Sequence, residues 1–366
     1  MKILNIMQGT HIGGTEKSSL TLMQEIQKKG VSFHVMSLTS MGKLQSHLDQ
    51  SNITYTGFLY EGFWGWRSYR KYRSFIKDSD ADAIMMTGHN LIGMLAIGNK
   101  CKGNRSLFIH FHHEGVKSFF AWKIIYFFAN IIFDKIYFAS NFILNEAIKI
   151  NPRIKNKSEY LPNPLRKKEL IRSDMRILSR EKLGLRKDEI VIGNAGWLIK
   201  RKRFDVLLRV CSEVKKEKQN IKILIAGDGD ERVNLENLAD DLGISENVIW
   251  LGWLDNLDDF FNSIDIMLFN SDWDSVGLSP LEAIQRGITT YASVINGGLN
   301  EILNNEYSIF IQNSHDVKKL SKKIINAINA PDETSLLTEE CRVHINQLSS
   351  PQLIANRVLS NYFMES

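Results

Sequence analysis

The densest group of side chains that could do chemistry lies in the segment Asn270–Ala283, where a polar stretch runs into an expected helix. Within it, the carboxylates Asp274 and Glu282 are separated by seven residues, and Gly277 and Leu278 lie between them. A glycine that allows tight backbone geometry, followed by the N–H groups of a helix start, favours the binding of an anion. Because carboxylates repel an anion, we expect Asp274 and Glu282 to accept hydrogen bonds from sugar hydroxyl groups instead.

The same segment also has a purely structural interpretation. Ser279, Pro280 and Glu282 have the spacing of a capping box. In that arrangement Ser279 is the N-cap, Pro280 the first helical residue and Glu282 the third. A capping box alone would explain Glu282 without any ligand, so both interpretations stay open.

Four consecutive cations, Lys200–Arg203, follow Gly196 at the end of another expected strand. Ammonium and guanidinium groups at a helix start are suited to binding a diphosphate. A run of charges is also typical of a solvated helix face, and the sequence does not choose between the two.

In the first half of the chain, the segment Gln8–Glu16 follows the first expected strand and opens a helix. Its paired glycines, Gly13 and Gly14, allow a ligand to approach the backbone, and the helix start attracts anions. An ordinary tight turn is the alternative. The glycines do not form GxGxxG and the second strand carries no acidic residue, so a dinucleotide site is disfavoured.

Three histidines and a glutamate gather in the segment His110–Glu114. Neighbouring residues on a strand point to opposite faces, and no second group of ligands has suitable spacing. We therefore predict no metal site, and a purely structural role for the histidines stays open.

The elements that must position these residues alternate between short apolar strands and amphipathic helices in both halves. This alternation predicts an α/β fold with two parallel sheets and right-handed crossovers. Ligands of such sheets bind beyond the carboxyl ends of the strands, so two sheets are expected to hold a ligand between them. The expected strands are Lys2–Met7, Ser32–Leu38, Ile53–Phe58, Ala83–Met86, Leu107–His110 and Lys135–Ala139, then Ile190–Gly193, Lys222–Ala226, Val248–Leu251, Ile266–Phe269, Thr289–Tyr291 and Ser308–Ile311.

The segment Leu161–Pro164 marks the expected boundary between two domains, because residues before proline adopt extended conformations. A chain of 366 residues is also longer than a single core usually supports. We expect an N-terminal domain over residues 1–165 and a C-terminal domain over residues 166–349. The last helix, at about residues 350–366, is expected to pack back on the N-terminal domain.

The charge of the chain is unevenly distributed. The net charge is +5, but Met1–Leu165 has 20 basic and 11 acidic residues, a net +9, and the remainder has 26 basic and 30 acidic, a net −4. A basic half favours an anionic partner such as a phosphate or a membrane surface. No helix-turn-helix, RRM or zinc pattern is present, so nucleic acid is disfavoured.

The cysteines and the apolar segments favour a soluble cytoplasmic protein. The three cysteines are far apart and form no CxxC pair, which fits a reducing compartment. The segment Met1–Ile6 is expected to form the first strand, and it lacks the long apolar region and small-residue cleavage site of a signal peptide. The most apolar stretch, Phe119–Phe133, is shorter than the ~20 residues of a membrane span.

Two stretches of the basic half combine cations with aromatic residues, Arg67–Lys77 and Phe119–Phe128. Together they would suit peripheral contact with an anionic bilayer. A solvated helix and an ordinary buried helix are the alternative interpretation.

The order of these motifs resembles a GT-B glycosyltransferase of the large retaining family 4 over nearly the whole chain. Each short match is weak, and their order and spacing together carry the resemblance. The matching segments are Gly13–Glu16 (GGxE), Pro162–Pro164 (the interdomain Pro-Asn segment), Gly196–Lys202 (G-R-x(4)-K), Ala226–Gly229 (a GxG turn), Leu251–Gly252, Asp274–Glu282 (E-x(7)-E) and Gly297–Glu301 (GGxxE).

This resemblance implies two Rossmann-like domains whose sheets face a central cleft. It implies transfer of a sugar from a nucleotide-sugar donor, with a UDP-sugar expected, to a glycan or lipid-linked acceptor in bacterial surface polysaccharide or lipopolysaccharide synthesis. The sugar would keep its anomeric configuration, and neither a metal nor a cofactor beyond the nucleotide-sugar would be needed. A sugar-nucleotide epimerase of the same fold and a non-catalytic sugar-nucleotide-binding relative are the alternatives.

In the second half, the resemblance implies that Glu282 binds the nucleotide ribose. Lys202 and the amides of Gly277 and Leu278 would bind the diphosphate, and Asp274 would face the transferred sugar.

In the first half, the resemblance implies that His112 contacts the donor sugar, with His110 and His113 as alternatives. The Gly13–Gly14 loop would face the donor, and the basic half would bind the acceptor and contact the inner face of the plasma membrane. His112, Asp274 and Lys202 are the implied catalytic residues.

Two positions depart from the family pattern. The family's arginine after Gly196 is Trp197 here, which removes an expected phosphate ligand. The first glutamate of E-x(7)-E is Asp274, which is one methylene shorter. The shorter carboxylate leaves the identity of the donor sugar open.

Overall fold

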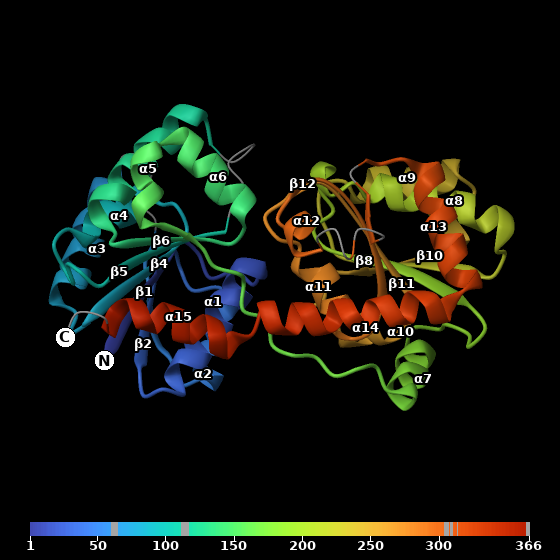
Figure 1. Ribbon diagram of the computed structural model, residues 1–366, viewed down its shortest axis with the longest axis horizontal. Coiled ribbons are helices and arrows are strands. Elements are labelled where there is room, and N and C mark those ends of the chain that lie inside the picture. Colours follow the sequence, from blue (N-terminus) through green and yellow to red (C-terminus); the bar gives the residue numbers. More distant parts are fainter. Residues whose placement is uncertain (60–64, 111–116, 304–306, 308–309, 313, 364–366) are drawn as a thin grey trace. The chain divides into compact units, whose positions relative to one another are not determined.

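The computed structural model describes residues 1–366 except 60–64, 111–116, 304–306, 308–309, 313 and 364–366. The chain divides into two compact units, one formed by Met1–Arg166 with Ser349–Ser366 and the other by Lys167–Leu348. Figure 1 shows that each unit is built on a sheet with helices around it.

The sheet of the first unit has seven parallel strands among the described residues, in the order β3-β2-β1-β4-β5-β6-β7. The order reverses between β1 and β4, so the loops after these two strands diverge at the carboxyl edge. Strand β7 was not expected, because its three residues are only half-buried at the edge of the sheet. The strands are β1 (Lys2–Met7), β2 (Ser32–Ser37), β3 (Thr54–Gly57), β4 (Ala83–Thr87), β5 (Arg105–Ile109), β6 (Lys135–Phe138) and β7 (Ser158–Tyr160).

Two hydrophobic cores hold the helices of the first unit to its sheet. One core includes Tyr72, Trp122 and Phe138, and the other includes Met23 and Val358. The second core brings the C-terminal helix back beside the N-terminal one, as Figure 1 shows. The helices are α1 (Gly14–Gln27), α2 (Leu44–Gln50), α3 (Trp66–Asp78), α4 (Leu91–Ile97), α5 (Phe119–Ile132), α6 (Asn141–Ile150), the 3₁₀ helix η1 (Pro152–Lys157) and α15 (Pro351–Phe363).

The sheet of the second unit has six parallel strands among the described residues, in the order β10-β9-β8-β11-β12-β13. Its central strands are near-continuous apolar runs such as that of β9, as expected for strands buried on both faces. The strands are β8 (Ile190–Ala195), β9 (Ile221–Ala226), β10 (Val248–Gly252), β11 (Ile266–Asp274), β12 (Thr289–Gly297) and β13 (Ile311–Gln312).

The helices of the second unit form two groups. Helix α8 packs against α9 and α13, while α7 packs against α10 and α11 against α14. The helices are α7 (Ser173–Lys182), η2 (Lys200–Lys202), α8 (Phe204–Glu217), α9 (Arg232–Asp241), η3 (Ser245–Asn247), α10 (Asp258–Ser263), α11 (Leu278–Gln285), α12 (Leu299–Ile302), α13 (Val317–Asn329) and α14 (Pro331–Leu348).

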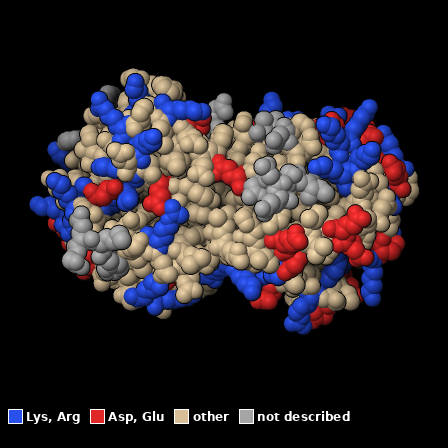
Figure 2. All heavy atoms as spheres, viewed as in Figure 1, with Lys and Arg blue, Asp and Glu red and all other residues tan. Residues whose placement is uncertain are grey.

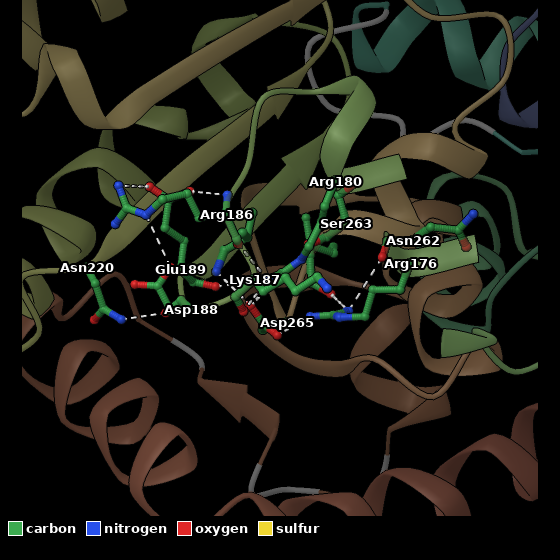
Figure 3. Close-up of polar contacts among 12 residues, drawn as sticks. Arg176, Arg180, Arg186, Lys187, Asp188, Glu189, Asn220, Asn262, Ser263 and Asp265 are labelled. Carbon is green, nitrogen blue, oxygen red and sulfur yellow. Dashed lines mark hydrogen bonds and ion pairs between the residues drawn. The ribbon is translucent and has the colours of Figure 1, made fainter. Parts of the chain in front are cut away.

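A partly buried charge cluster attaches α7 to this sheet (Figure 3). Arg176 and Arg180 both pair with the carboxylate of Asp265, which also accepts a hydrogen bond from the backbone N–H of Val191 at 2.7 Å. The Arg180 side chain is only 6% exposed and donates to the carbonyl oxygen of Ser263 at 3.1 Å. This cluster fixes the start of β8 to β11, the two strands whose far ends carry the candidate site.

Candidate functional site

The strand order of the second sheet reverses between β8 and β11. In open parallel sheets, the loops on the two sides of such a reversal run in opposite directions, and they leave a crevice at the carboxyl edge of the sheet. The loop after β8 contains Lys200–Arg203, and the end of β11 contains Asp272–Asp274. The topology therefore brings the predicted cations and the predicted carboxylate segment together.

Strand β11 is five residues longer than expected. The sequence predicted a polar loop after Phe269, but β11 continues to Asp274, which pairs in register with Gly297 of β12. A Cβ atom at Gly297 would lie 2.1 Å from the carbonyl oxygen of Asp274, so only glycine allows this approach. Because side chains alternate along a strand, Asp272 and Asp274 project to the same face.

Lys202 and Asp274, predicted from separate motifs, form an ion pair. Their side chains are only 14% and 15% exposed, and the Lys202 ammonium lies 4.9 Å from the ring centroid of Phe269. Burial alone would raise the pKa of the Asp274 carboxyl, but Lys202 and the nearby Arg201 overcome burial and lower it. Asp274 is thus held as a carboxylate that accepts hydrogen bonds.

The two arginines beside Lys202 also contact β11. Arg201 donates to the carbonyl oxygen of Trp273 at 3.2 Å, and its guanidinium lies 4.1 Å from the centroid of the Trp273 ring. Arg203 makes two hydrogen bonds to Asp205, at 2.9 and 3.0 Å, and a third to Asp272 at 3.1 Å. The interpretation of this run as a solvated helix face is therefore wrong for Arg201, Lys202 and Arg203.

Behind Asp272 lies a histidine that the sequence analysis missed. His315 Nε2 is 3.0 Å from Asp272 Oδ1, and His315 Nδ1 is 2.6 Å from Ser293 Oγ. Asp272 therefore bridges Arg203 and His315. No local sequence pattern predicts this contact, because Arg203, Asp272 and His315 are far apart in the sequence.

The capping-box interpretation of Glu282 is wrong. Helix α11 begins at Leu278, two residues earlier than that pattern requires, with Gly277 as N-cap in the left-handed region at φ 75°. The Ser279 hydroxyl donates to the carbonyl oxygen of Ala195 at 3.0 Å instead of capping the helix. Glu282 lies further along α11, with a half-buried carboxylate 3.8 Å from Arg286.

Two glycines after β9 allow backbone to pack on backbone beside this site. A Cβ atom at Gly227 would lie 1.8 Å from the carbonyl oxygen of Gly196, and one at Gly229 would lie 2.5 Å from that of Leu198. Trp197 is 50% exposed and its ring centroid lies 4.3 Å from that of Trp253. The position of the family's arginine thus holds an aromatic pair.

In the first unit, Gly13 is the N-cap of α1 and Gly14 its first residue. The Glu16 carboxyl faces the backbone N–H groups of Gly13 and of Glu16 itself; burial raises its pKa and these N–H groups oppose the rise. Glu16 therefore acts as the third-residue half of a capping box. The ligand role of Gly13 and Gly14 stays a prediction.

His110 follows β5 at the carboxyl edge of the first sheet. Burial lowers the pKa of His110 to about 4, although the nearby Asn163 side chain opposes this, so the imidazole is neutral at pH 7. Both residues line a small cavity beside β4, β5 and β6. The predicted catalytic residue His112 and its alternative His113 lie outside the described residues.

Within the described part of the chain, no group of three or more His, Cys, Asp or Glu side chains is arranged to hold a metal ion. Within the same residues, no helix has the length and apolar character needed to cross a bilayer.

Comparison with known proteins gives partial sequence matches. Residues 175–342 match the family described as glycosyl transferases group 1. A lipopolysaccharide core biosynthesis glycosyltransferase of Rhizobium meliloti, LpsD, is 34% identical over 110 residues, which are 30% of this chain and 31% of that protein. An O-antigen biosynthesis glycosyltransferase of Escherichia coli, WclY, is 30% identical over 116 residues, 32% of each chain. The matched part thus spans about a third of these relatives.

The fold comparison covers the whole chain. Anabaena HepE, solved in complex with UDP-glucose, has a TM-score of 0.87 at 16% identity, with 99% of both chains covered. The lipopolysaccharide glycosyltransferase WaaG has a TM-score of 0.75 at 14% identity, with 97% of this chain and 99% of that chain covered. The chain therefore has the GT-B fold, and its residues 175–342 are similar to the glycosyl transferases group 1.

Proposed function

We propose that this protein transfers a sugar from a nucleotide-sugar, with a UDP-sugar as donor, to a glycan or lipid-linked acceptor in the synthesis of a bacterial surface polysaccharide. The observation that carries the proposal is the Lys202–Asp274 ion pair beside the Gly277–Leu278 turn, at the strand reversal of the matched unit. The UDP-glucose bound by HepE and the lipopolysaccharide and O-antigen roles of the partial relatives support the donor and the acceptor class.

In this proposal, the negative charge that develops on the departing diphosphate is met by fixed positive groups. Lys202 supplies an ammonium group, and the N–H groups at the start of α11 supply the positive end of a helix. Groups held in place before the reaction need no reorganisation when the charge develops, which is the main source of electrostatic catalysis. A diphosphate bound in this way needs no metal ion.

The two carboxylates take the sugar hydroxyl groups. Asp274 is ionised and already accepts hydrogen bonds, so the hydroxyl groups of the transferred sugar are suitable donors to it. Glu282 is not used as a helix cap, and its two oxygens match the two adjacent hydroxyl groups of ribose. Retention of the anomeric configuration belongs to the same proposal, as does contact between His112 and the donor sugar.

A non-catalytic relative that only binds the nucleotide-sugar is the second candidate. Trp197 favours it, because this residue replaces a phosphate-binding arginine and its ring contacts the ring of Trp253. The two candidates differ in whether the bond between sugar and diphosphate breaks.

Release of UDP from UDP-glucose, with water as a slow acceptor, tests the proposal. We expect the wild-type protein to release UDP, and Lys202→Ala to release it at least about tenfold more slowly because a charged hydrogen bond to the leaving group is lost. Lys200→Ala is the matched control, since Lys200 is an exposed cation two residues away. A donor that binds and stays intact over many hours would establish the binding relative instead.

The proposed place of the reaction is the cytoplasm, at the inner face of the plasma membrane. The basic charge of the first half, a net +9 over Met1–Leu165, favours an anionic surface. A lipid-linked acceptor would lie in that surface.

A further inference from the structure

Helix α5 of the first unit has apolar residues on two opposite faces. The face toward the sheet is buried and includes Trp122, Ile125, Tyr126, Ala129 and Ile132. The sequence left open whether this whole segment is an ordinary buried helix, but four of its large apolar side chains are exposed. Their exposed fractions are 63% for Phe119, 69% for Phe120, 43% for Phe127 and 57% for Ile131.

These four residues, called the α5 stripe below, lie on one side of the helix. At about 100° per residue, positions 119, 120, 127 and 131 fall within roughly a third of the circumference, opposite the buried face. Lys123 falls in the same sector and is exposed. Single exposed apolar residues are ordinary on protein surfaces, but an aligned stripe of four large apolar side chains in water indicates a binding surface.

The charge around the α5 stripe is strongly positive. Residues 117–157, which run from the start of α5 through α6 and η1, contain seven Lys and Arg and two acidic residues, a net +5. Both acidic residues are paired, Asp134 with Arg105 and Glu146 with Lys149. Helices α4 and α6 and η1 pack against α5, and Figure 2 shows several Lys and Arg side chains over this part of the unit.

We propose that the α5 stripe docks on an anionic lipid bilayer. Its aromatic rings would enter the boundary between headgroups and acyl chains, as the apolar face of an interfacial helix does. The exposed cations Lys117, Lys123, Arg153 and Lys155 would meet the anionic headgroups. The inference rests on the proposed function in one respect, since a lipid-linked acceptor would lie in the same bilayer.

The same observations disfavour a second copy of this chain as the occupant. A symmetric dimer through the α5 stripe would place Lys123 against its own counterpart and one +5 region against another. Like charges at that separation repel, whereas an anionic bilayer satisfies both the apolar stripe and the cations.

Co-sedimentation of the full chain with lipid vesicles tests the proposal. We expect binding to vesicles of phosphatidylcholine with phosphatidylglycerol, weaker binding in higher salt, and little binding to phosphatidylcholine alone. Replacing two aromatic rings in Phe119→Ser/Phe120→Ser should weaken binding at least about tenfold. Each cation near the surface contributes about fivefold to binding of an anionic bilayer. Lys117→Glu/Lys123→Glu, which removes two cations, should therefore weaken vesicle binding more than about tenfold.

Matched controls separate the α5 stripe from general surface effects. Leu353→Ser on α15 removes an apolar side chain that is 61% exposed in the same unit, and Lys318→Glu/Lys319→Glu reverses two exposed cations on α13. Both controls should bind vesicles like the wild type. Equal losses in the α5 variants and the controls would overturn the proposal.

Two further readouts complete the test. Sedimentation velocity without lipid would overturn the proposal if it showed a dimer that the Phe119→Ser/Phe120→Ser variant abolishes. UDP binding without lipid should be unchanged in all α5 variants, because they lie outside the donor site. An α5 variant that loses vesicle binding but still binds UDP therefore tests only the bilayer contact. A wild-type protein that does not bind UDP would count only against the proposed function.

Discussion

At the scale of single residues, the Lys202–Asp274 ion pair is the centre of the candidate site. It is nearly buried, and it joins two motifs that are 72 residues apart in the sequence. Removing one partner of such a pair leaves a buried charge without compensation. The ion pair thus makes two predictions, one for ligand binding and one for pH.

Lys202→Ala should weaken UDP binding at least about tenfold, because a hydrogen bond between an ammonium group and a phosphate is lost. Isothermal titration calorimetry with UDP measures this change. Lys200→Ala, which removes the exposed cation two residues earlier, should bind UDP like the wild type. Equal affinity of Lys202→Ala and the wild type would remove Lys202 from the donor site.

The pH prediction follows from the lowered pKa of Asp274. Its carboxyl group has a pKa below the ordinary 3.8 in the folded protein, despite the opposing effect of burial. The ion pair therefore contributes its full stability above pH ~4, and this stability is lost as the pH falls through the lower pKa of the folded state. Lys202→Met should be less stable than the wild type at pH 7. The difference should shrink below pH ~4 in urea unfolding followed by circular dichroism, and a difference that grows there would contradict this account.

His315 makes a further prediction at this scale. It holds Asp272, and Asp272 holds Arg203 next to Lys202, so His315 acts as a positioning residue. His315→Ala should raise the KM for the UDP-sugar several-fold with little change in kcat, and His315→Gln should restore part of the loss because its amide donates to Asp272. His344→Ala, on α14, is the control and should leave both constants unchanged. A loss of kcat alone would argue against a positioning role.

At the scale of secondary-structure elements, the sequence predicted where strands begin better than where two of them end. The apolar starts of β11 and β12 were visible, but their polar ends at Asp274 and Gly297 were not. The polar ends of β11 and β12 are strands because they pair with each other. Whether a segment forms a strand depends strongly on its neighbouring strand, and not on its own residues alone. The last expected strand, Ser308–Ile311, begins outside the described residues, and β13 starts at Ile311.

The start of α11 shows a local signal overridden by backbone geometry. Ser279 and Glu282 match a capping box, yet Gly277 adopts the left-handed conformation and begins the helix earlier. The carboxylate of Glu282, which a capping box would have bound to the backbone, therefore stays available at the candidate site. A substitution at Gly277 tests whether this helix start stabilises the fold and binds the donor.

Gly277→Ala should lower the free energy of unfolding by about 1–2 kcal/mol, because a residue with a Cβ atom is disfavoured at φ 75°. It should also weaken UDP binding, since the amides of the turn shift. Gly184→Ala is a matched control, because Gly184 has φ 70° and no atom within 4 Å of its Cβ position. Both variants should lose similar stability in chemical unfolding, but only Gly277→Ala should lose UDP affinity in calorimetry. Similar UDP affinity in both variants would show that this turn does not bind the donor.

At the scale of the whole molecule, the alternation of strands and helices was sufficient to predict two parallel α/β sheets, and the GT-B fold is confirmed by HepE and WaaG. The order of the strands within each sheet was not predicted, because it depends on contacts between residues far apart in the sequence. The sequence did predict that the last helix packs on the first unit, and α15 shares a core with α1 in which Val358 and Leu359 lie together with Met23 and Ile26. The contacts of Lys202 with Asp274, of Arg203 with Asp272 and of His315 with Asp272 each span more than 40 residues of sequence, which explains why His315 was missed.

The central claim is that the second unit binds a nucleoside diphosphate through Lys202. It is tested most directly by thermal unfolding of the full chain with UDP, GDP, UDP-glucose and NAD, each with and without a chelator. A ligand at about 100 times its Kd stabilises a protein by about 2.7 kcal/mol. We therefore expect UDP to raise the Tm by several degrees, with or without the chelator, and to raise it less for Lys202→Ala than for Lys200→Ala. A rise with NAD alone, or an equal rise in both variants, would contradict the claim.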